Sequence, residues 1–325
     1  MSERLDRRGF VVLGAGALAV LAAPPLLRPR ERLVRRTVPV MGTVADIAVP
    51  TRYRSWAHAA MDAAVAELHR TEALMSRFRV DSDVGRFNRA DTGTRVSVSP
   101  ETAEVVAAAL GWAQATDGHF DPCLARLTEL WSRDGQSEPP AGALIALFAG
   151  RELWKGVDPT KVGERDGLLK LDRDAALDLG GIAKGFGADL AARALREYGV
   201  ERGLVNVGGD LVALGTGPGG RPWRIGVRDP AYPTRVRAEL DLEDRALATS
   251  GDYLRYFEHG GRRYHHLLDP GTGEPAQAGL HTVTVSAPDA MTADAAATTA
   301  FALGVDRAAR LPVVERAGVL IVDTG

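Results

Sequence analysis

Apolar residues recur three or four positions apart in several parts of the chain, which is the spacing of one face of an α-helix. Ala60, Ala64 and Leu68 show this spacing and predict an amphipathic helix over 55–77. A second helix is predicted to begin at Ser99, since serine followed by proline and glutamate is a typical helix start. The predicted helices cover 55–77, 99–116, a short segment ending near Trp131, 182–198 and 290–303.

Shorter apolar runs, bounded by glycine, proline and polar turn residues, predict β-strands. These strands cover 34–49 (with a turn at 41–43), 168–178, 203–207, 211–214, 223–228, 236–241, 245–249, 253–257, 262–267, 281–286 and 317–322. The segments 80–93 and 132–142 are polar and rich in turn residues, which predicts surface loops. Helices and strands are mixed without a regular strand–helix–strand rhythm, so we expect an α+β fold in a single mixed helix and sheet domain.

The N-terminus has the pattern of an export signal. Arg7 and Arg8 precede an apolar run of about 14 residues, and two prolines then stop any helix. Paired arginines before such a run are typical of twin-arginine export, and the run is shorter than the roughly 20 residues that a membrane span needs. We therefore predict a twin-arginine-type signal peptide at 1–30 and a mature domain at 31–325, exported to the periplasm or the outer face of the cytoplasmic membrane. An uncleaved membrane anchor and a buried N-terminal helix are the alternatives.

The overall charge argues against a general nucleic-acid-binding protein. The formal net charge is −2, whereas a basic binding face usually shows in the total. The sequence has one cysteine, Cys123, which excludes an intrachain disulfide and a cysteine-based zinc site. It has no Gly-x-Gly-x-x-Gly motif opening a βαβ unit, so a bound flavin would not occupy a standard Rossmann site.

The segment from Leu177 to Asp189 has the strongest chemical pattern. A predicted strand delivers Asp178, two glycines turn the chain, and a helix begins with Lys184 in its first turn. Free backbone N–H groups at a helix start favour phosphate, and glycines let the backbone approach a ligand closely. Asp178 is placed to accept hydrogen bonds from a ligand ring or sugar. Taken alone, the segment is equally compatible with a plain glycine-rich bend.

Asp294 and Thr298 form a second candidate pair. They lie four residues apart and therefore share one face of the predicted 290–303 helix. A carboxylate and a hydroxyl are hard oxygen ligands, which suit Mg²⁺ and not zinc. The alternative is an alanine-rich packing helix whose Asp294 caps its first turn.

His265 and His266 precede a turn formed by residues 269–273. Neighbouring residues on a strand face opposite ways, so at most one of the two histidines can serve a site. A hairpin with a solvated histidine pair is the alternative. Three further segments, 117–122, 206–210 and 248–253, are either parts of a site or ordinary turns.

Taken together and in order, these segments resemble the ApbE family, the FAD:protein FMN transferases. The resemblance extends over about 37–322, nearly the whole mature chain, and the order of its motifs makes it specific. The motifs are Met41-Gly42-Thr43, then Met75-Ser76-Arg77-Phe78 with Ser82 and Phe87-Asn88, then 117–122 with Leu130-Trp131, then 178–185, 207–210, 250–253 and 266–273, and last Asp294 with Thr298.

The resemblance implies roles for individual residues. Mg²⁺ would be held by Asp294, Thr298 and the backbone carbonyl of Gly181, a position where the family often has alanine or serine. Lys184 would stabilise charge on the phosphates, and His266 is the candidate general base. Phe78 stands where the family often has tyrosine or tryptophan, so it could stack on a ring but could not offer a hydroxyl. The residues expected to line FAD are Met41, Phe78, Gly118, His119, Phe120, Asp121, Asp178, Lys184 and Leu268.

The activity that the resemblance implies is Mg²⁺-dependent transfer of FMN from FAD to a serine or threonine hydroxyl of an acceptor flavoprotein, with release of AMP. FAD would be the substrate, and the partner would be an exported FMN-binding protein with a short Ser/Thr motif; no nucleic acid is expected. Two alternatives are hydrolysis of FAD to FMN and AMP, and an exported protein that only binds FAD. The Asp294/Thr298 pair and His266 argue against the last of these, because storage requires no base.

Overall fold

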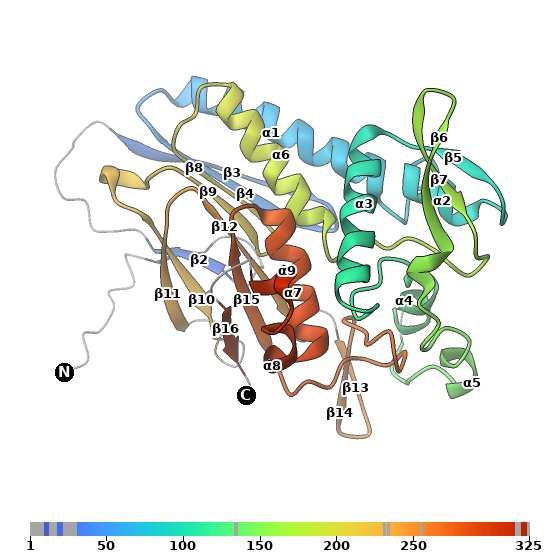
Figure 1. The fold of residues 1–325 in the computed structure, drawn as a ribbon. Coiled ribbons are helices and arrows are strands. Elements are labelled where there is room, and N and C mark those ends of the chain that lie inside the picture. The colour runs from blue at the N-terminus through green and yellow to red at the C-terminus, as the bar shows by residue number, and fades with distance from the viewer. Residues whose placement is uncertain are drawn as a thin grey trace.

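The computed structural model describes residues 10–12, 18–21, 31–132, 136–229, 232, 235–253, 256–315 and 320–323. Figure 1 shows two parts side by side: a large sheet with helices α1, α6 and α7, and a smaller part that contains α2 to α5 and β5 to β7. The α+β class expected from the sequence is confirmed.

The large sheet is seven-stranded, and its paired strands are antiparallel. Its strands in spatial order are β16 (Leu320–Asp323), β15 (Thr282–Ala287), β12 (Arg245–Gly251), β9 (Asp210–Leu214), β8 (Gly203–Val207), β4 (Thr43–Thr51) and β3 (Arg32–Val40). Strands β9 and β12 are adjacent and antiparallel in the middle of the sheet. Residues at the start of β9 therefore lie close to residues in the second half of β12.

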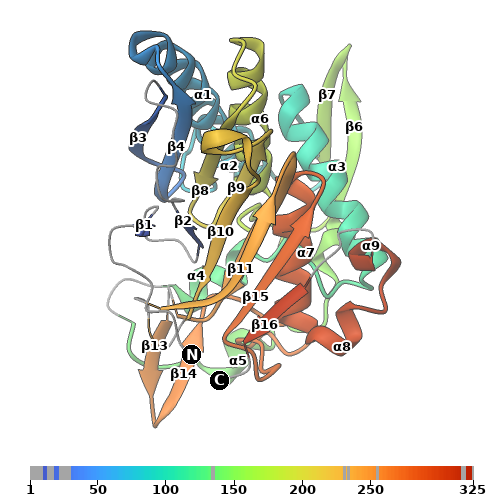
Figure 2. The ribbon, with the colours of Figure 1, turned by 90° about the vertical axis from the view of Figure 1, so that its left-hand side faces the viewer.

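Both faces of this sheet are covered. The helices on one face are α1 (Arg54–Met75), α6 (Ala183–Glu197) and α7 (Ala290–Leu303). Alanines such as Ala60 and Ala191 are fully buried there and let α1 and α6 approach closely. The other face packs on Trp223 and Ile225 of the hairpin formed by β10 (Trp223–Arg228) and β11 (Val236–Leu242), which stands in front of the sheet in Figure 2.

The smaller part lies between α1 and α6 in the sequence. Its elements are α2 (Asp83–Arg89), β5 (Arg95–Ser97), α3 (Pro100–Ala115), α4 (Ala125–Trp131), α5 (Gly142–Ile145), the 3₁₀ helix η2 (Leu153–Gly156), β6 (Val157–Val162) and β7 (Arg165–Lys170). They surround an apolar cluster that includes Phe87 and Leu127 and continues to Phe301 of α7. This cluster joins the two parts of the molecule.

A separate hairpin, β13 (Tyr256–His259) and β14 (Arg262–His265), docks on α4. The Tyr264 ring stacks on Trp131 with ring centroids 5.7 Å apart, and on Phe257 at 5.1 Å. The remaining described elements are η3 (Pro218–Gly220), α8 (Val305–Ala308) and α9 (Pro312–Glu315).

Three local predictions were wrong. The loop predicted at 80–93 contains α2, because Ser82 caps a helix start by accepting a hydrogen bond from Gly85 N at 2.8 Å, and Phe87 is buried. The strand predicted over 168–178 ends at Lys170, and the following residues form only an isolated bridge to Leu124. The strand predicted over 262–267 ends one residue before His266.

Much of the predicted signal peptide at 1–30 lies outside the described residues, as do 316–319 of the predicted last strand. Within the leader, β1 (Phe10–Val12) pairs with β2 (Leu18–Leu21), and β2 pairs with β10. No helix among the described residues is both long and apolar enough to cross a membrane. Cleavage of the leader and export of the chain stay predictions.

Candidate functional site

The segment that leads into α6 is held in place by the side chains of Asn88 and Arg77. The Asn88 side chain makes two hydrogen bonds to the backbone of Leu177, with Nδ2 donating to its carbonyl at 2.9 Å and Oδ1 accepting from its N–H at 2.6 Å. Asp178 follows directly, and its carboxylate accepts from Gly180 N at 3.0 Å and pairs with Arg77 Nε at 3.2 Å. The predicted FAD contact Asp178 is therefore already oriented by protein groups.

Helices α6 and α7 approach each other closely at Gly185. A Cβ built at Gly185 would lie 2.5 Å from the carbonyl carbon of Ala290 and closer still to its oxygen, so a side chain has no room there. The Asp189 carboxylate of α6 accepts from the N–H groups of Ala290 and Met291, both at 2.9 Å. Since these are free N–H groups in the first turn of α7, Asp189 fixes where α7 begins.

Three charged side chains meet where the two helices touch. Lys184 Nζ lies 2.7 Å from Asp210 Oδ2 and 3.1 Å from Asp294 Oδ2. Gly185 N donates a further hydrogen bond to Asp294 at 3.2 Å. Asp210 and Asp294 are only 2% and 3% exposed. We call Lys184, Asp210 and Asp294 the charged triad.

The triad has two carboxylates for one ammonium group. Burial lowers the pKa of Lys184, but Asp210 and Asp294 outweigh burial and hold that pKa above its ordinary value. Burial and then the charge of Asp294 raise the pKa of Asp210 to about 8, against the opposing pull of Lys184. The triad carries an excess negative charge only when Asp210 is ionised, and a bound cation would favour that ionised form.

Asp294 is a predicted magnesium ligand, and the other two, Gly181 and Thr298, lie next to each other. A Cβ built at Gly181 would lie 3.0 Å from Thr298 Oγ1, so the Gly181 backbone and the Thr298 hydroxyl are neighbours. Ser250 Oγ of β12 is 3.5 Å from the same hydroxyl. Among the described residues no group of three or more His, Cys, Asp or Glu side chains could hold a metal. One carboxylate, a hydroxyl and a carbonyl nevertheless fit Mg²⁺, which is commonly bound by one or two carboxylates together with substrate phosphates and water.

The turn at 41–43 borders α6. Met41 has φ of +53°, a left-handed conformation that is rare for residues other than glycine. A Cβ built at Gly187 would lie 3.0 Å from Met41 Sδ, and one built at Gly208 would lie 2.7 Å from Thr43 Oγ1. These close approaches bring the 41–43 turn, Gly187 of α6 and the turn before Asp210 together.

The loop at 117–122 approaches the site from the smaller part. The Phe120 ring is buried, and its Cε2 would lie 3.4 Å from a Cβ at Gly181. His119 Nε2 lies 3.2 Å from Arg307 Nη2 of α8. Gly118 has φ of +77°, and a Cβ there would press on the Trp154 indole at 3.2 Å. The smaller part thus contributes Phe120 next to the predicted metal ligands.

Asp121 holds this loop together. Its carboxylate accepts hydrogen bonds from Cys123 N at 2.8 Å and from Trp154 N at 3.2 Å. Burial raises the pKa of Asp121 to about 6, although both backbone hydrogen bonds act in the opposite direction. Asp121 therefore shapes the backbone around the predicted FAD site.

The two adjacent histidines have different surroundings. His265 is buried, its Nε2 lies 3.0 Å from the Ala276 carbonyl oxygen, and its ring meets Phe301 edge-on. Burial lowers the pKa of His265, so the neutral ring is favoured. His266 is half-buried and follows the end of β14. Leu268, a predicted FAD contact, is buried and bridges to Pro275.

Phe78 is the most exposed of the predicted FAD contacts, with 78% of its surface accessible. The Arg77 guanidinium lies 4.3 Å from the centre of its ring. Since Arg77 also pairs with Asp178, Phe78 is connected through Arg77 to the start of the glycine-rich segment. An exposed aromatic ring in this position is free to stack on a ligand.

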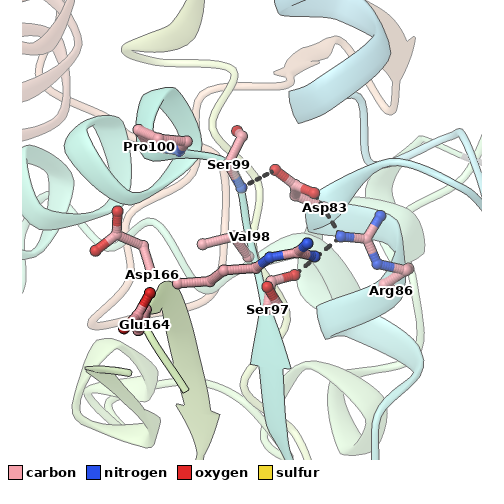
Figure 3. A pocket seen from close by; sticks show the side chains of 9 residues that line it. Asp83, Arg86, Ser97, Val98, Ser99, Pro100, Glu164 and Asp166 are labelled. Atoms are coloured by element: carbon pink, nitrogen blue, oxygen red, sulfur yellow. Dashed lines mark hydrogen bonds and ion pairs between the residues drawn. The ribbon is translucent and has the colours of Figure 1, made fainter. Parts of the chain in front are cut away.

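Two pockets lie outside the charged triad. One, of about 620 Å³, is lined mainly by charged and polar residues of α2, β5 and the β6–β7 turn, together with Val98 and Pro100 (Figure 3), and contains none of the predicted site residues. Its Asp83 is already bonded to Ser99 N at 2.8 Å. The other, of about 450 Å³, is lined by Ala278, Leu280 and residues 303–307. It includes Arg307, which places it beside His119.

Four residues of the site received no role from the sequence: Arg77, Asn88, Asp210 and Arg307. Asp210 follows a Gly-Gly turn, and Arg77 and Asn88 stand in motifs, but nothing in their spacing indicates that Asp210 reaches Lys184 across 26 residues. Arg307 stands in no motif. These contacts depend on how α6, α7 and β9 pack.

A model of the ApbE family matches residues 41–320. The FAD:protein FMN transferase of Haemophilus influenzae is 35% identical over 257 residues, which cover 77% of this chain and 74% of the relative. The ApbE protein of Thermotoga maritima has a similar structure, with a TM-score of 0.79, 32% identity and coverage of 90% and 94% of the two chains. The flavinyl transferase ApbE of Pseudomonas stutzeri has a TM-score of 0.75, 30% identity and coverage of 91% and 92%.

Proposed function

The chain belongs to the ApbE family, and on that premise we propose that it transfers FMN from FAD to a hydroxyl of an acceptor protein. Similar proteins are named FAD:protein FMN transferase or flavinyl transferase. The observation that carries the proposal is the charged triad beside Gly181 and Thr298, at the start of a glycine-rich helix that suits phosphate.

We propose that Mg²⁺ is held by the Asp294 carboxylate, the Thr298 hydroxyl and the Gly181 carbonyl. The two buried carboxylates of the triad and the hard oxygen donors support this assignment. When bound, the ion would neutralise charge on the pyrophosphate of FAD. Lys184, anchored by Asp210, adds positive charge beside the same phosphates.

The reaction is a phosphoryl transfer. The oxygen of an acceptor serine or threonine attacks the phosphorus on the FMN side of FAD, a new P–O bond forms, and the bond to the AMP phosphate breaks. AMP leaves with the bridging oxygen. His266 takes the proton of the attacking hydroxyl, since histidine generally titrates near neutral pH.

The proposed partner is an exported FMN-binding protein that carries a short Ser/Thr motif. The same proposal places this chain in the periplasm or on the outer face of the cytoplasmic membrane, supported by Arg7-Arg8 before an apolar run.

The test is to incubate the full chain with FAD, Mg²⁺ and candidate acceptor domains, and to follow flavin fluorescence on denatured acceptor together with AMP. Covalently fluorescent acceptor with equimolar AMP supports the proposal. Free FMN and AMP without labelled acceptor would show FAD hydrolysis instead. Unchanged FAD that stays bound would show a binding protein.

A further inference from the structure

A buried carboxylate that none of the roles above uses lies at the end of β12, beside the site. Asp252 directly follows β12, and its N–H donates to the carbonyl of His281, the residue before β15, at 3.2 Å. Asp252 is only 6% exposed. Its Oδ1 is buried and has no hydrogen-bond partner among the described residues.

The second oxygen of Asp252 joins two strands. Asp252 Oδ2 lies 2.9 Å from His281 Nδ1 and 3.4 Å from Arg263 Nη1 of β14. Arg263 and His281 are about one-third and 44% exposed, so the carboxylate is the buried member of this group. Asp252 therefore connects β14 to the end of the β12–β15 ladder.

This connection lies between the predicted metal ligands and the candidate base. Ser250, which is 3.5 Å from Thr298 Oγ1, precedes Asp252 by two residues, or about 7 Å of extended chain on the same face. On the other side, Arg263 precedes His266 by three residues. Asp252 thus joins the strand that contacts Thr298 to the strand that leads to His266.

The two faces of β14 have different partners. Tyr264 faces Trp131 of α4, and Arg262 pairs with Glu274 at 3.1 Å. Arg263 and His265 face the other way, toward Asp252 and toward Phe301 of α7. Arg263 also pairs with Glu258 of β13 at 3.7 Å, but its contact with Asp252 links β14 to the sheet, whereas the Arg262–Glu274 contact stays within the hairpin and its following turn.

We propose that Asp252 is a positioning residue, which acts through Arg263 to hold His266 at the correct place relative to Thr298 and the charged triad. This inference rests on the proposed function, with His266 as its base. A base misplaced by a fraction of an ångström to 1 Å loses much of its effect on the rate, while FAD binding is unaffected. Asp252 therefore matters for transfer only when His266 is present.

The test compares Asp252→Asn and Arg263→Gln with the matched control Arg262→Gln, which removes an ion pair from the neighbouring position of the same strand. We expect the first two variants to lower kcat for FMN transfer about tenfold, with less than a twofold change in the FAD dissociation constant. Arg262→Gln should retain the wild-type kcat. Asp252→Glu should recover part of the rate, because it keeps the charge.

The deciding measurement repeats Asp252→Asn in the His266→Ala background by single-turnover labelling. If Asp252 acts through His266, adding Asp252→Asn to His266→Ala changes the residual labelling rate of the His266→Ala variant by less than twofold. An unchanged kcat in both Asp252→Asn and Arg263→Gln, or an equal tenfold loss in the His266→Ala background, would overturn the inference. If Asp252→Asn does not fold, the effect of Arg263→Gln is compared in the wild-type and His266→Ala backgrounds instead, because Arg263 is the more exposed partner of the pair. A wild-type chain that labels no acceptor would instead refute the proposed function.

Discussion

The close approach of α6 and α7 predicts the effect of Gly185→Ala. The new Cβ would lie 2.5 Å from the Ala290 carbonyl carbon and 2.8 Å from Met291 Cα, both backbone atoms that no rotamer change can move. The helices must separate by about 0.5–1 Å, and overpacking of this kind typically costs about 1–3 kcal/mol. The higher helix propensity of alanine offsets up to about 1 kcal/mol of this cost. We expect a net loss of about 1–2 kcal/mol in the free energy of unfolding.

Gly111→Ala is the matched control for this prediction. Gly111 lies on an exposed position of α3, and a Cβ there would meet nothing within 4 Å. Only the propensity gain remains, so this variant should be more stable than the wild type by up to about 1 kcal/mol. Chemical denaturation of both variants isolates the cost of the clash as their difference.

The same separation should lengthen the hydrogen bond from Gly185 N to Asp294, so Gly185→Ala should also weaken Mg²⁺-dependent stabilisation and FMN transfer. A melting curve with and without Mg²⁺ and the labelling assay measure these two effects. If Gly185→Ala is as stable as Gly111→Ala and labels acceptor at the wild-type rate, the close packing of the two helices is not what builds the site.

Three further predictions concern the charges and the leader. Asp294→Ala should abolish transfer and the shift in melting temperature caused by Mg²⁺ while the fold survives; an unchanged shift would place the metal elsewhere. His266→Ala should lower transfer by roughly 10²–10⁴-fold with little change in FAD affinity. His265→Ala should chiefly lower the melting temperature, because His265 is buried against Phe301. Equal kinetic losses in the two variants would argue against His266 as the base. Replacing Arg7 and Arg8 by lysine should leave precursor in the cytoplasm, as cell fractionation would show, and normal export would exclude the twin-arginine route.

The sequence predicts local structure well where one face of an element is apolar, and poorly where a short polar segment depends on distant partners. Helix α1 is recognisable from the spacing of Ala60, Ala64 and Leu68, all of which are buried. Helix α2 is not, because its Asp83 bonds to Ser99 N and its Asn88 bonds to Leu177, contacts that its own polar residues do not indicate. Only the folded chain shows that Asn88 fixes the approach to Asp178.

The same limit applies to the site. The i, i+4 spacing of Asp294 and Thr298 and the Gly-Gly turn before Lys184 are visible in the sequence, and the structure brings these residues together. Asp210 could not be assigned, since an acid after a Gly-Gly turn is usually part of an ordinary hairpin. Its contact with Lys184 requires β9 to pair between β8 and β12 and α6 to cross that sheet.

The stability of the fold alone does not explain why two buried carboxylates, and not one, surround Lys184. One lysine and one aspartate would neutralise each other, whereas a second buried carboxylate adds a desolvation cost that the shared ammonium compensates only in part. A protein selected for stability alone would lose little by replacing Asp294 with an apolar residue. A divalent cation reverses this balance, because it favours the ionised form of both carboxylates and leaves an excess of positive charge beside Gly181 and Thr298. That positive excess suits the pyrophosphate of FAD, so the feature that is least favourable for the protein alone is the one that the proposed reaction requires.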